Sequence, residues 1–191
     1  MLAKAISVEK EFNKSDFTLQ PPSFGDYEEC SFLNCNFSEI DLSQIHFSDC
    51  EFTACNLAMA KINKTSFQNC RFVGCKLTGL HFEYCNPMLF SVSFETCDLT
   101  LCSFFKLKMP KTNFKSCKLK DTDLAEADLS NAIFDRCDLE GAIFENTNIE
   151  KADFRTAYNF TIDPEKNKIK KGKFSRDGLS GLLAKYHLDV E

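Results

Sequence analysis

Eleven cysteines are the residues of this sequence with the greatest capacity for chemistry, since thiols bind metals, form disulfides and attack electrophiles. Pairs such as Cys30 and Cys35 are five residues apart, whereas structural zinc sites place about two to four residues between paired ligands. An odd count at repetitive spacing also argues against the disulfide framework of a secreted protein. The pattern therefore predicts reduced, buried thiols that fill space as small hydrophobic residues, with no metal and no cofactor.

No other set of residues forms a catalytic motif. The sequence contains no P-loop, zinc-protease motif, nucleophile elbow or dinucleotide-binding glycine pattern. His46 and His81 each precede a regularly spaced apolar residue and are predicted to point outward, and His187 lies in the tail. We therefore predict that the protein is not an enzyme.

The cysteines belong to a five-residue repeat, because ten of them stand two residues before a regularly spaced apolar residue and Cys85 keeps the same frame. These apolar centres run from Tyr27 to Phe82 and from Phe94 to Phe154 in steps of five. A period of five fits neither a helix nor a plain strand, so the chain must turn a corner in every repeat. Phe94, Phe114 and Phe134 are 20 residues apart, which indicates four repeats per coil. The 25 centres then make a little more than six coils, a rod of about 30 Å at the spacing of adjacent strands.

The repeat resembles the motif of the pentapeptide-repeat family: Ala or Cys, then Asp or Asn, then Leu or Phe, then two variable residues. The segments that carry the resemblance include CNFSE (35–39), CDLTL (97–101), ADLSN (127–131) and CDLEG (137–141). The resemblance implies an all-β solenoid, a right-handed quadrilateral β-helix, over residues 27–159. Residues 1–26 are predicted to form an N-terminal partial coil and cap, since Phe12 and Phe17 keep the frame.

The frame shifts within residues 83–93. Twelve residues separate Phe82 from Phe94 where two repeats need ten. One interpretation is a local bulge that shifts the register, and the other is a binding loop. In the second interpretation Met88, Leu89 and Phe90 form an exposed apolar contact for a partner.

Charge is divided between two adjacent stretches. Residues 99–120 contain six lysines and no acid, whereas residues 121–153 contain ten acids and two bases. A surface polarised in this way orients a charged partner or keeps the rod soluble. The partner contacts predicted in these stretches are Lys106, Lys108, Lys111, Asp121, Asp123 and Asp128.

The five-residue pattern fades after Tyr158, and residues 160–191 are predicted to form a capping or dimerising tail. Within it, four apolar or aromatic residues follow the i, i+3, i+4, i+7 spacing, which predicts an amphipathic helix over about 176–187. Ser175 or Asp177 is its expected N-cap. The residues predicted to cap the last coil or to contact a second copy are Leu179, Leu182, Leu183 and Tyr186.

Two functions remain open. The quinolone-resistance (Qnr-type) branch of the family is held to consist of dimeric DNA mimics that bind type II topoisomerases, and the tail GLSGLLAKYHLDVE resembles its C-terminal helix. That resemblance implies a protein partner, DNA gyrase or topoisomerase IV, without direct nucleic-acid binding. The alternative is a generic protein-interaction scaffold. The sequence lacks a signal-peptide pattern and a membrane-spanning run, so we expect a cytoplasmic protein.

Overall fold

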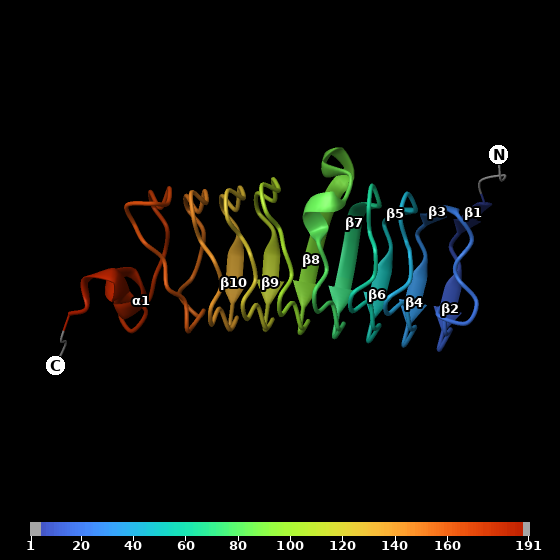
Figure 1. Cartoon of the computed structure of the whole chain (residues 1–191), viewed down its shortest axis with the longest axis horizontal. Coiled ribbons are helices and arrows are strands. Elements are labelled where there is room, and N and C mark those ends of the chain that lie inside the picture. The colour runs from blue at the N-terminus through green and yellow to red at the C-terminus, as the bar shows by residue number, and fades with distance from the viewer. Residues whose placement is uncertain (1–4, 189–191) are drawn as a thin grey trace.

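The protein is a right-handed quadrilateral β-helix with a short C-terminal helix, and the computed structural model describes residues 5–188 (Figure 1). The first four residues of the predicted N-terminal segment and the last three of the predicted tail lie outside the described residues. The strands are β1 (Ala5–Val8), β2 (Glu11–Asn13), β3 (Gly25–Glu28), β4 (Ser31–Leu33), β5 (His46–Ser48), β6 (Glu51–Thr53), β7 (Ser66–Val73), β8 (Phe90–Glu95), β9 (Asn113–Lys115) and β10 (Ile133–Asp135).

The strands pair in parallel with the residues one coil later, so that each wall of the rod is a ladder. Phe32 pairs with Phe52, and Phe52 pairs with Phe72. Where no strand is assigned, single bridges continue the ladder at the same spacing, as between Asp98 and Lys118. We number the walls from the N-terminus by their inward centres: wall 1 begins with Ser7 and Tyr27, wall 2 with Phe12 and Phe32, wall 3 with Phe17 and Phe37, and wall 4 with Leu42 and Ile62.

Wall 2 carries the most regular part of the core. Each of its phenylalanine rings stacks on the ring of the next coil, with centroids 4.6–5.5 Å apart. The stack comprises Phe12, Phe32, Phe52, Phe72, Phe94, Phe114, Phe134, Phe154 and Phe174. Nine rungs at the spacing of adjacent strands give a rod about 40 Å long. Apolar rings without hydrogen-bonding groups suit this interior, because each ring between the two ends of the stack faces another ring above and below.

The corner of each repeat is made by the second residue after the centre, which adopts a left-handed conformation. Asn34, Glu39 and Lys64 have φ of 53°, 61° and 57°. The strain of this conformation is offset by the ladder, because the corner N–H donates to a carbonyl of the next coil, as Asn34 does to Thr53 at 2.9 Å. Corner residues of successive coils therefore form columns along the edges of the rod.

The frame shift predicted within residues 83–93 is a bulge. The Asn86 N–H donates to the Thr65 carbonyl and its side chain to Ser66, in the register of the regular coils. Beyond it, Phe90 pairs with Phe67 and Val92 with Cys70. Between these points the 3₁₀ turns η1 (Phe82–Tyr84) and η2 (Pro87–Leu89) accommodate the extra residues. In Figure 1 this segment rises above the rod beside β7 and β8. The register therefore shifts at this segment, and wall 2 continues without interruption.

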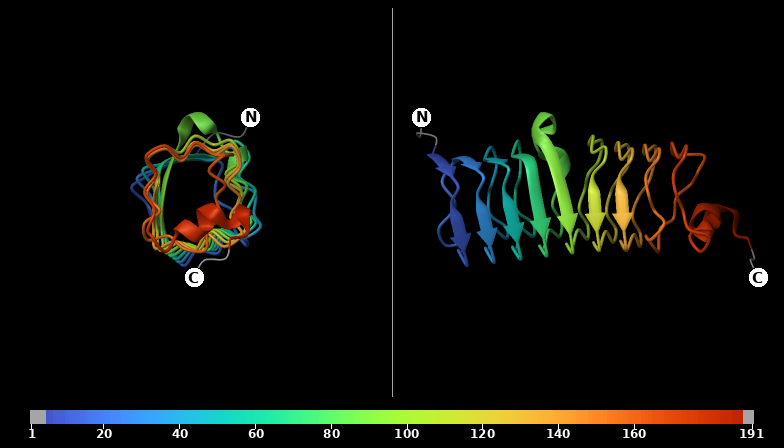
Figure 2. Two further views of the ribbon diagram at one scale, coloured as in Figure 1. Left: turned by 90° about the vertical axis from the view of Figure 1, so that its left-hand side faces the viewer. Right: turned by 180° about the vertical axis from the view of Figure 1, so that it is seen from behind.

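The ladder continues beyond the residue at which the sequence pattern fades. Asn148 bridges Lys168, Asp153 bridges Lys173, and Phe174 stacks on Phe154 at 5.3 Å. The α-helix α1 (Leu179–Leu183) and the 3₁₀ turn η3 (Ala184–Tyr186) follow. Figure 2 shows α1 lying across the open end of the last coil. No helix in residues 5–188 is long and apolar enough to cross a bilayer.

Candidate interaction surfaces

The cysteines are structural. All eleven are buried and free. Ten of the thiols donate to a carbonyl oxygen of the preceding coil, and Cys117 donates to Lys115 in its own coil. Cys50 donates to Tyr27 at 3.3 Å, and Cys102 donates to Leu77 at 3.0 Å. Burial in this apolar interior raises the pKa of both thiols to about 12, which keeps them protonated. Within residues 5–188 no group of three or more His, Cys, Asp or Glu side chains is arranged to hold a metal ion.

The recurrent aspartates of the repeats have a structural role that was not predicted from the sequence. Asp123 accepts a hydrogen bond from the N–H of Ala125 at 2.9 Å, and Asp128 accepts one from Ser130 at 3.0 Å. A short side chain carrying an acceptor is needed to reach the N–H two residues later, which explains why Asp or Asn occupies this position. The pKa of Asp41 is lowered by the equivalent bonds from Ser43. These two predicted partner contacts therefore also hold the corners of the repeat.

The two histidines in the repeats point outward, as the frame predicts. His46 Nδ1 lies 3.9 Å from Asp26, and His81 Nδ1 lies 2.9 Å from Glu83. His81 also stacks on the ring of Tyr84. Both histidines thus pair with a carboxylate on the surface.

The lysine stretch and the acidic stretch are neighbours in space because they are 20 residues apart. Lys106 pairs with Glu126 at 3.5 Å, and Lys120 pairs with Glu140 at 3.0 Å. Lys115 pairs in the other direction, with Glu95 at 2.7 Å. Lysines and acids that are separated along the chain thus partly neutralise one another between adjacent coils.

Wall 2 shows this neutralisation most completely. Arg71 lies between Glu51 and Glu95 at 3.2 and 2.8 Å, and Lys115 follows on the other side of Glu95. The ammonium of Lys115 and the guanidinium of Arg71 lower the pKa of Glu95. Opposite charges one coil apart occupy the same positions as cross-strand pairs in a sheet, so they stabilise the ladder.

The predicted apolar contact at the bulge is only partly exposed. Met88 is 88% exposed at the tip of η2, and its N–H is capped by Asn86 at 3.1 Å. Leu89 is half-buried, and Phe90 packs against the core with its ring 5.8 Å from Phe82. Leu89 also borders a groove of about 320 Å³ on wall 1.

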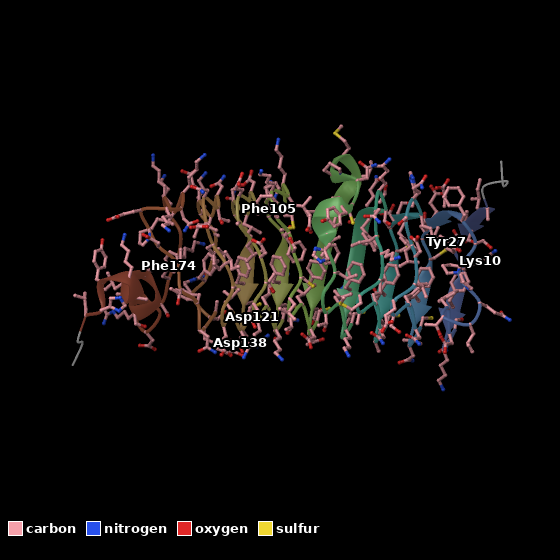
Figure 3. The ribbon with its side chains drawn as sticks, in the orientation of Figure 1. Lys10, Tyr27, Phe105, Asp121, Asp138 and Phe174 are labelled. Carbon is pink, nitrogen blue, oxygen red and sulfur yellow. The ribbon has the colours of Figure 1, made fainter. Side chains whose placement is uncertain are left out.

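The residues predicted as one set of partner contacts lie on several surfaces. Lys108, Lys111 and Asp128 face outward from wall 1, beyond the bulge. Asp121 lies at the corner of walls 3 and 4, and Asp123 lies on wall 4. Lys106 lies at the corner of walls 4 and 1. Figure 3 shows Asp121 and Asp138 along one edge of the rod.

The cap is held by both apolar and charged contacts. Leu182 packs against the core, and the Gly181 carbonyl accepts a hydrogen bond from the Ile162 N–H at 3.0 Å. The helix α1 lies directly against Phe160, because a Cβ at Gly181 would collide with the Phe160 backbone. Lys185 pairs with Asp163 and Glu165, each at 2.7 Å.

The other predicted cap residues face outward. Leu179 and Leu183 are 47% and 39% exposed. The Tyr186 hydroxyl donates to Glu165 at 2.9 Å. Gly178, not Ser175 or Asp177, is the N-cap residue of α1, although Ser175 accepts a hydrogen bond from the Gly178 N–H at 3.0 Å. A groove of about 940 Å³ separates the helix from wall 3.

Two family models match the chain: one described as pentapeptide repeat region over residues 25–86, and one described as pentapeptide repeats (8 copies) over residues 122–158. No curated protein matches. Two trypsin-treated variants of QnrB1, described as a plasmid-mediated fluoroquinolone resistance protein, are 19% and 18% identical, each with a TM-score of 0.63. The matches cover 98% and 99% of this chain and 98% and 100% of theirs.

A second protein of known structure is HetL, described as a pentapeptide repeat protein involved in heterocyst differentiation regulation from the cyanobacterium Nostoc sp. strain PCC 7120. It is 15% identical with a TM-score of 0.50, and the match covers 93% of this chain and 87% of HetL. At these identities the neighbours establish a shared fold.

Proposed function

Because this chain belongs to the pentapeptide-repeat family, we propose that it is a non-enzymatic binding protein that acts on a bacterial type II topoisomerase, DNA gyrase or topoisomerase IV, by presenting a DNA-like surface. The match to QnrB1 over nearly the whole of both chains supports a related partner. A core filled by stacked rings supports binding through the outer surface, since twelve phenylalanines are fully buried. Such an interior leaves recognition to the side chains on the walls.

The pairing of charges between coils carries this proposal. The lysines at 106, 115 and 120 would oppose an anionic surface if they were free, but each is held by a glutamate one coil away. Residues 27–159 contain 19 acids and 13 bases, so a negative excess remains along the rod. Duplex DNA likewise carries regular negative charge along a narrow rod. The cationic groove with which a topoisomerase binds duplex DNA would therefore also bind this rod.

The test is gyrase supercoiling and fluoroquinolone-stabilised cleavage, titrated with the purified protein at several salt concentrations. We expect inhibition or protection that fades as salt rises, because a charge-dominated contact is screened. The variant Asp121→Asn with Asp123→Asn removes two charges while the amide oxygen at 123 keeps the corner bond. Glu39→Gln with Asp41→Asn is the matched control, since these residues occupy the same two positions four coils earlier. Full activity of the Asp121 and Asp123 variant would locate binding elsewhere, and no effect of the native protein on either enzyme would refute the proposal.

A scaffold that binds another protein is the second candidate, and the exposure of Met88 favours it. A long apolar side chain at the tip of a protruding turn suits an apolar pocket on a partner. Partner binding through this turn would be insensitive to salt and would be lost in Met88→Lys. The two candidates therefore differ in both salt response and the variant that abolishes binding.

A second copy is the remaining proposed partner. The outward face of α1, formed by Leu179 and Leu183, supports pairing of two copies through the cap. Leu182 is engaged with the core and contributes to the cap instead. Leu183→Lys would abolish a dimer of this kind without disturbing the coil.

A further inference from the structure

The last coil and the cap carry a charge opposite to that of the whole chain. Residues 160–188 contain seven lysines and arginines against three acids, whereas the protein as a whole has a net charge of −5 at pH 7. Four of these cations lie within residues 168–173, which run along walls 1 and 2 of the last coil, next to α1 in Figure 1. The C-terminal end of the rod is therefore basic, although the rod is acidic overall.

Five lysines gather at the edge between walls 1 and 2. Lys168 bridges Asn148 on wall 1, and Lys173 bridges Asp153 on wall 2, which places both lysines in the last coil. Lys151 and Lys171 are corner residues of successive coils, with φ of 59° and 60°. We call this surface the basic edge, and its residues are Lys151, Lys168, Lys170, Lys171 and Lys173.

The basic edge has few counter-charges. All five lysines are exposed, and all except Lys173 form no ion pair with another described residue. Lys173 lies 3.8 Å from Asp153, whose carboxylate is already held by Arg155 at 2.7 Å. Lys151 and Lys171 are like charges one coil apart, an arrangement that destabilises a sheet. Anions from outside the molecule would offset this repulsion.

The neighbouring positions are basic as well. Residues 148–156 and 168–176 form the last two rungs of walls 1 and 2, and they contain seven bases and two acids, Glu150 and Asp153. The acids of the first coil, Glu9 and Glu11, lie about 40 Å away at the spacing of adjacent strands. Salt screens charges over about 10 Å at 0.1 M. The acidic end of the rod therefore does not cancel the potential at the basic edge.

We propose that the basic edge binds the phosphate backbone of duplex DNA. Lysine ammonium groups bind phosphates as point charges. None of the exposed large apolar side chains of residues 5–188 lies within 148–156 or 168–176. A stable membrane contact needs apolar groups as well as cations, and the centre of a protein–protein interface is apolar. Contacts with DNA phosphates need only cations and polar groups, so the composition of this surface selects DNA.

This contact goes beyond the proposed topoisomerase contact and does not depend on it. The resemblance to Qnr-type proteins implied no direct binding of nucleic acid, and the basic edge departs from that expectation. One consequence does rest on the proposed function. A cationic groove that receives the acidic walls of the rod would repel the basic edge. The edge would then lie outside the groove, where DNA held by the enzyme supplies phosphates.

The test measures the fluorescence anisotropy of a short labelled DNA duplex, titrated with the whole protein in the absence of any topoisomerase. We expect a Kd of roughly 10 µM or below at about 50 mM salt. Binding should weaken by more than about tenfold at about 150 mM salt, because each phosphate contact releases counterions. A native protein that does not bind the duplex at the lower salt concentration would overturn the proposal.

Two triple variants separate the basic edge from net charge. Binding should weaken by more than about tenfold in the edge variant, which combines Lys168→Glu, Lys170→Glu and Lys171→Glu. The matched control makes the same change of net charge at exposed lysines of walls 3 and 4, and it combines Lys61→Glu, Lys64→Glu and Lys76→Glu. The control should bind within about threefold of the native protein. Equal weakening in the two variants would contradict a local contact, and thermal unfolding verifies that both are folded.

A labelled poly-glutamate of similar length tests an acidic protein segment as the partner. It carries one charge per about 3.4 Å of extended chain, whereas duplex DNA carries one per about 1.7 Å. Poly-glutamate should therefore bind at least about tenfold more weakly than the duplex. Equal or tighter binding of poly-glutamate would assign the basic edge to an acidic protein instead of DNA. Because no topoisomerase is present, failure of DNA binding leaves the topoisomerase proposal intact.

Discussion

The ring of Phe94 stacks on the ring of Phe72 at 5.5 Å, although the two residues are 22 positions apart and every other pair in wall 2 is 20 apart. The next ring, Phe114, again stacks at 5.3 Å. Stacking is thus maintained and the additional residues are expelled to the surface as η2. Burial of an aromatic ring stabilises the fold by more than a regular turn does. This explains why the ring stack stays regular and the turn before β8 does not.

Removal of the additional residues should be tolerated. Deleting Pro87 and Met88 places Leu89 directly after Cys85 and Asn86, which recreates the repeat motif and a spacing of 20 residues. We expect the free energy of unfolding in urea to change by less than about 1 kcal/mol. Deleting Ser130 and Asn131 from a regular coil is the matched control, and it should unfold the protein or lower its stability severely, because the spacing of that coil falls to 18. Equal loss of stability in both deletions would contradict the assigned register.

Replacing Phe114 with Ala should cost about 3–5 kcal/mol of unfolding free energy, because the ring is fully buried and the rigid coils cannot collapse into the cavity. Phe94 and Phe134 lie on either side of it. Ile133→Ala, on the outside of the neighbouring strand β10, should cost less than about 1 kcal/mol. Urea denaturation measures both. A loss below about 1 kcal/mol for Phe114→Ala would show that its ring is not enclosed between coils.

The thiols should be unreactive in the folded protein. All eleven thiols are buried and shielded from reagents in solution, and burial raises the pKa of Cys50 and Cys102 to about 12, so these two carry almost no thiolate at neutral pH. Ellman's reagent should therefore detect very little thiol in the native protein and all eleven cysteines after denaturation. Fast reaction of a subset at neutral pH, with the fold intact, would show that part of the interior opens readily.

The cap should loosen in acid. Lys185 lowers the pKa of Asp163 and Glu165, so both carboxyls are more acidic in the folded protein than in the unfolded chain. Their contribution is complete above the unfolded pKa values of about 4 and is lost as pH falls through the lower folded values. The exchange protection of the Ile162 amide, which donates to Gly181, should therefore fall below about pH 4. In Lys185→Met, the protection of this amide should be weaker at neutral pH and should change less with pH. The same dependence on pH in both proteins would show that the ion pairs of Lys185 do not hold the cap.

Some features of the interaction surfaces follow only from the tertiary structure. The sequence predicted outward positions for Asp123 and Asp128, but their bonds to backbone N–H groups depend on the geometry of each corner. The last coil was not predicted, because Asn159 stands where an apolar centre is expected and the neighbouring Phe160 is buried in its place.

The sequence by itself determined the β-helix, the burial of the cysteines and the presence of two additional residues, because a five-residue apolar period constrains each repeat locally. The tertiary structure decided where those residues protrude, which lysines meet which acids and how α1 covers the final coil. These features depend on contacts between residues about 20 positions apart or on the irregular last coil, and their energies arise only when the coils stack. Local pattern therefore specified the walls, and stacking specified the surfaces that the walls present.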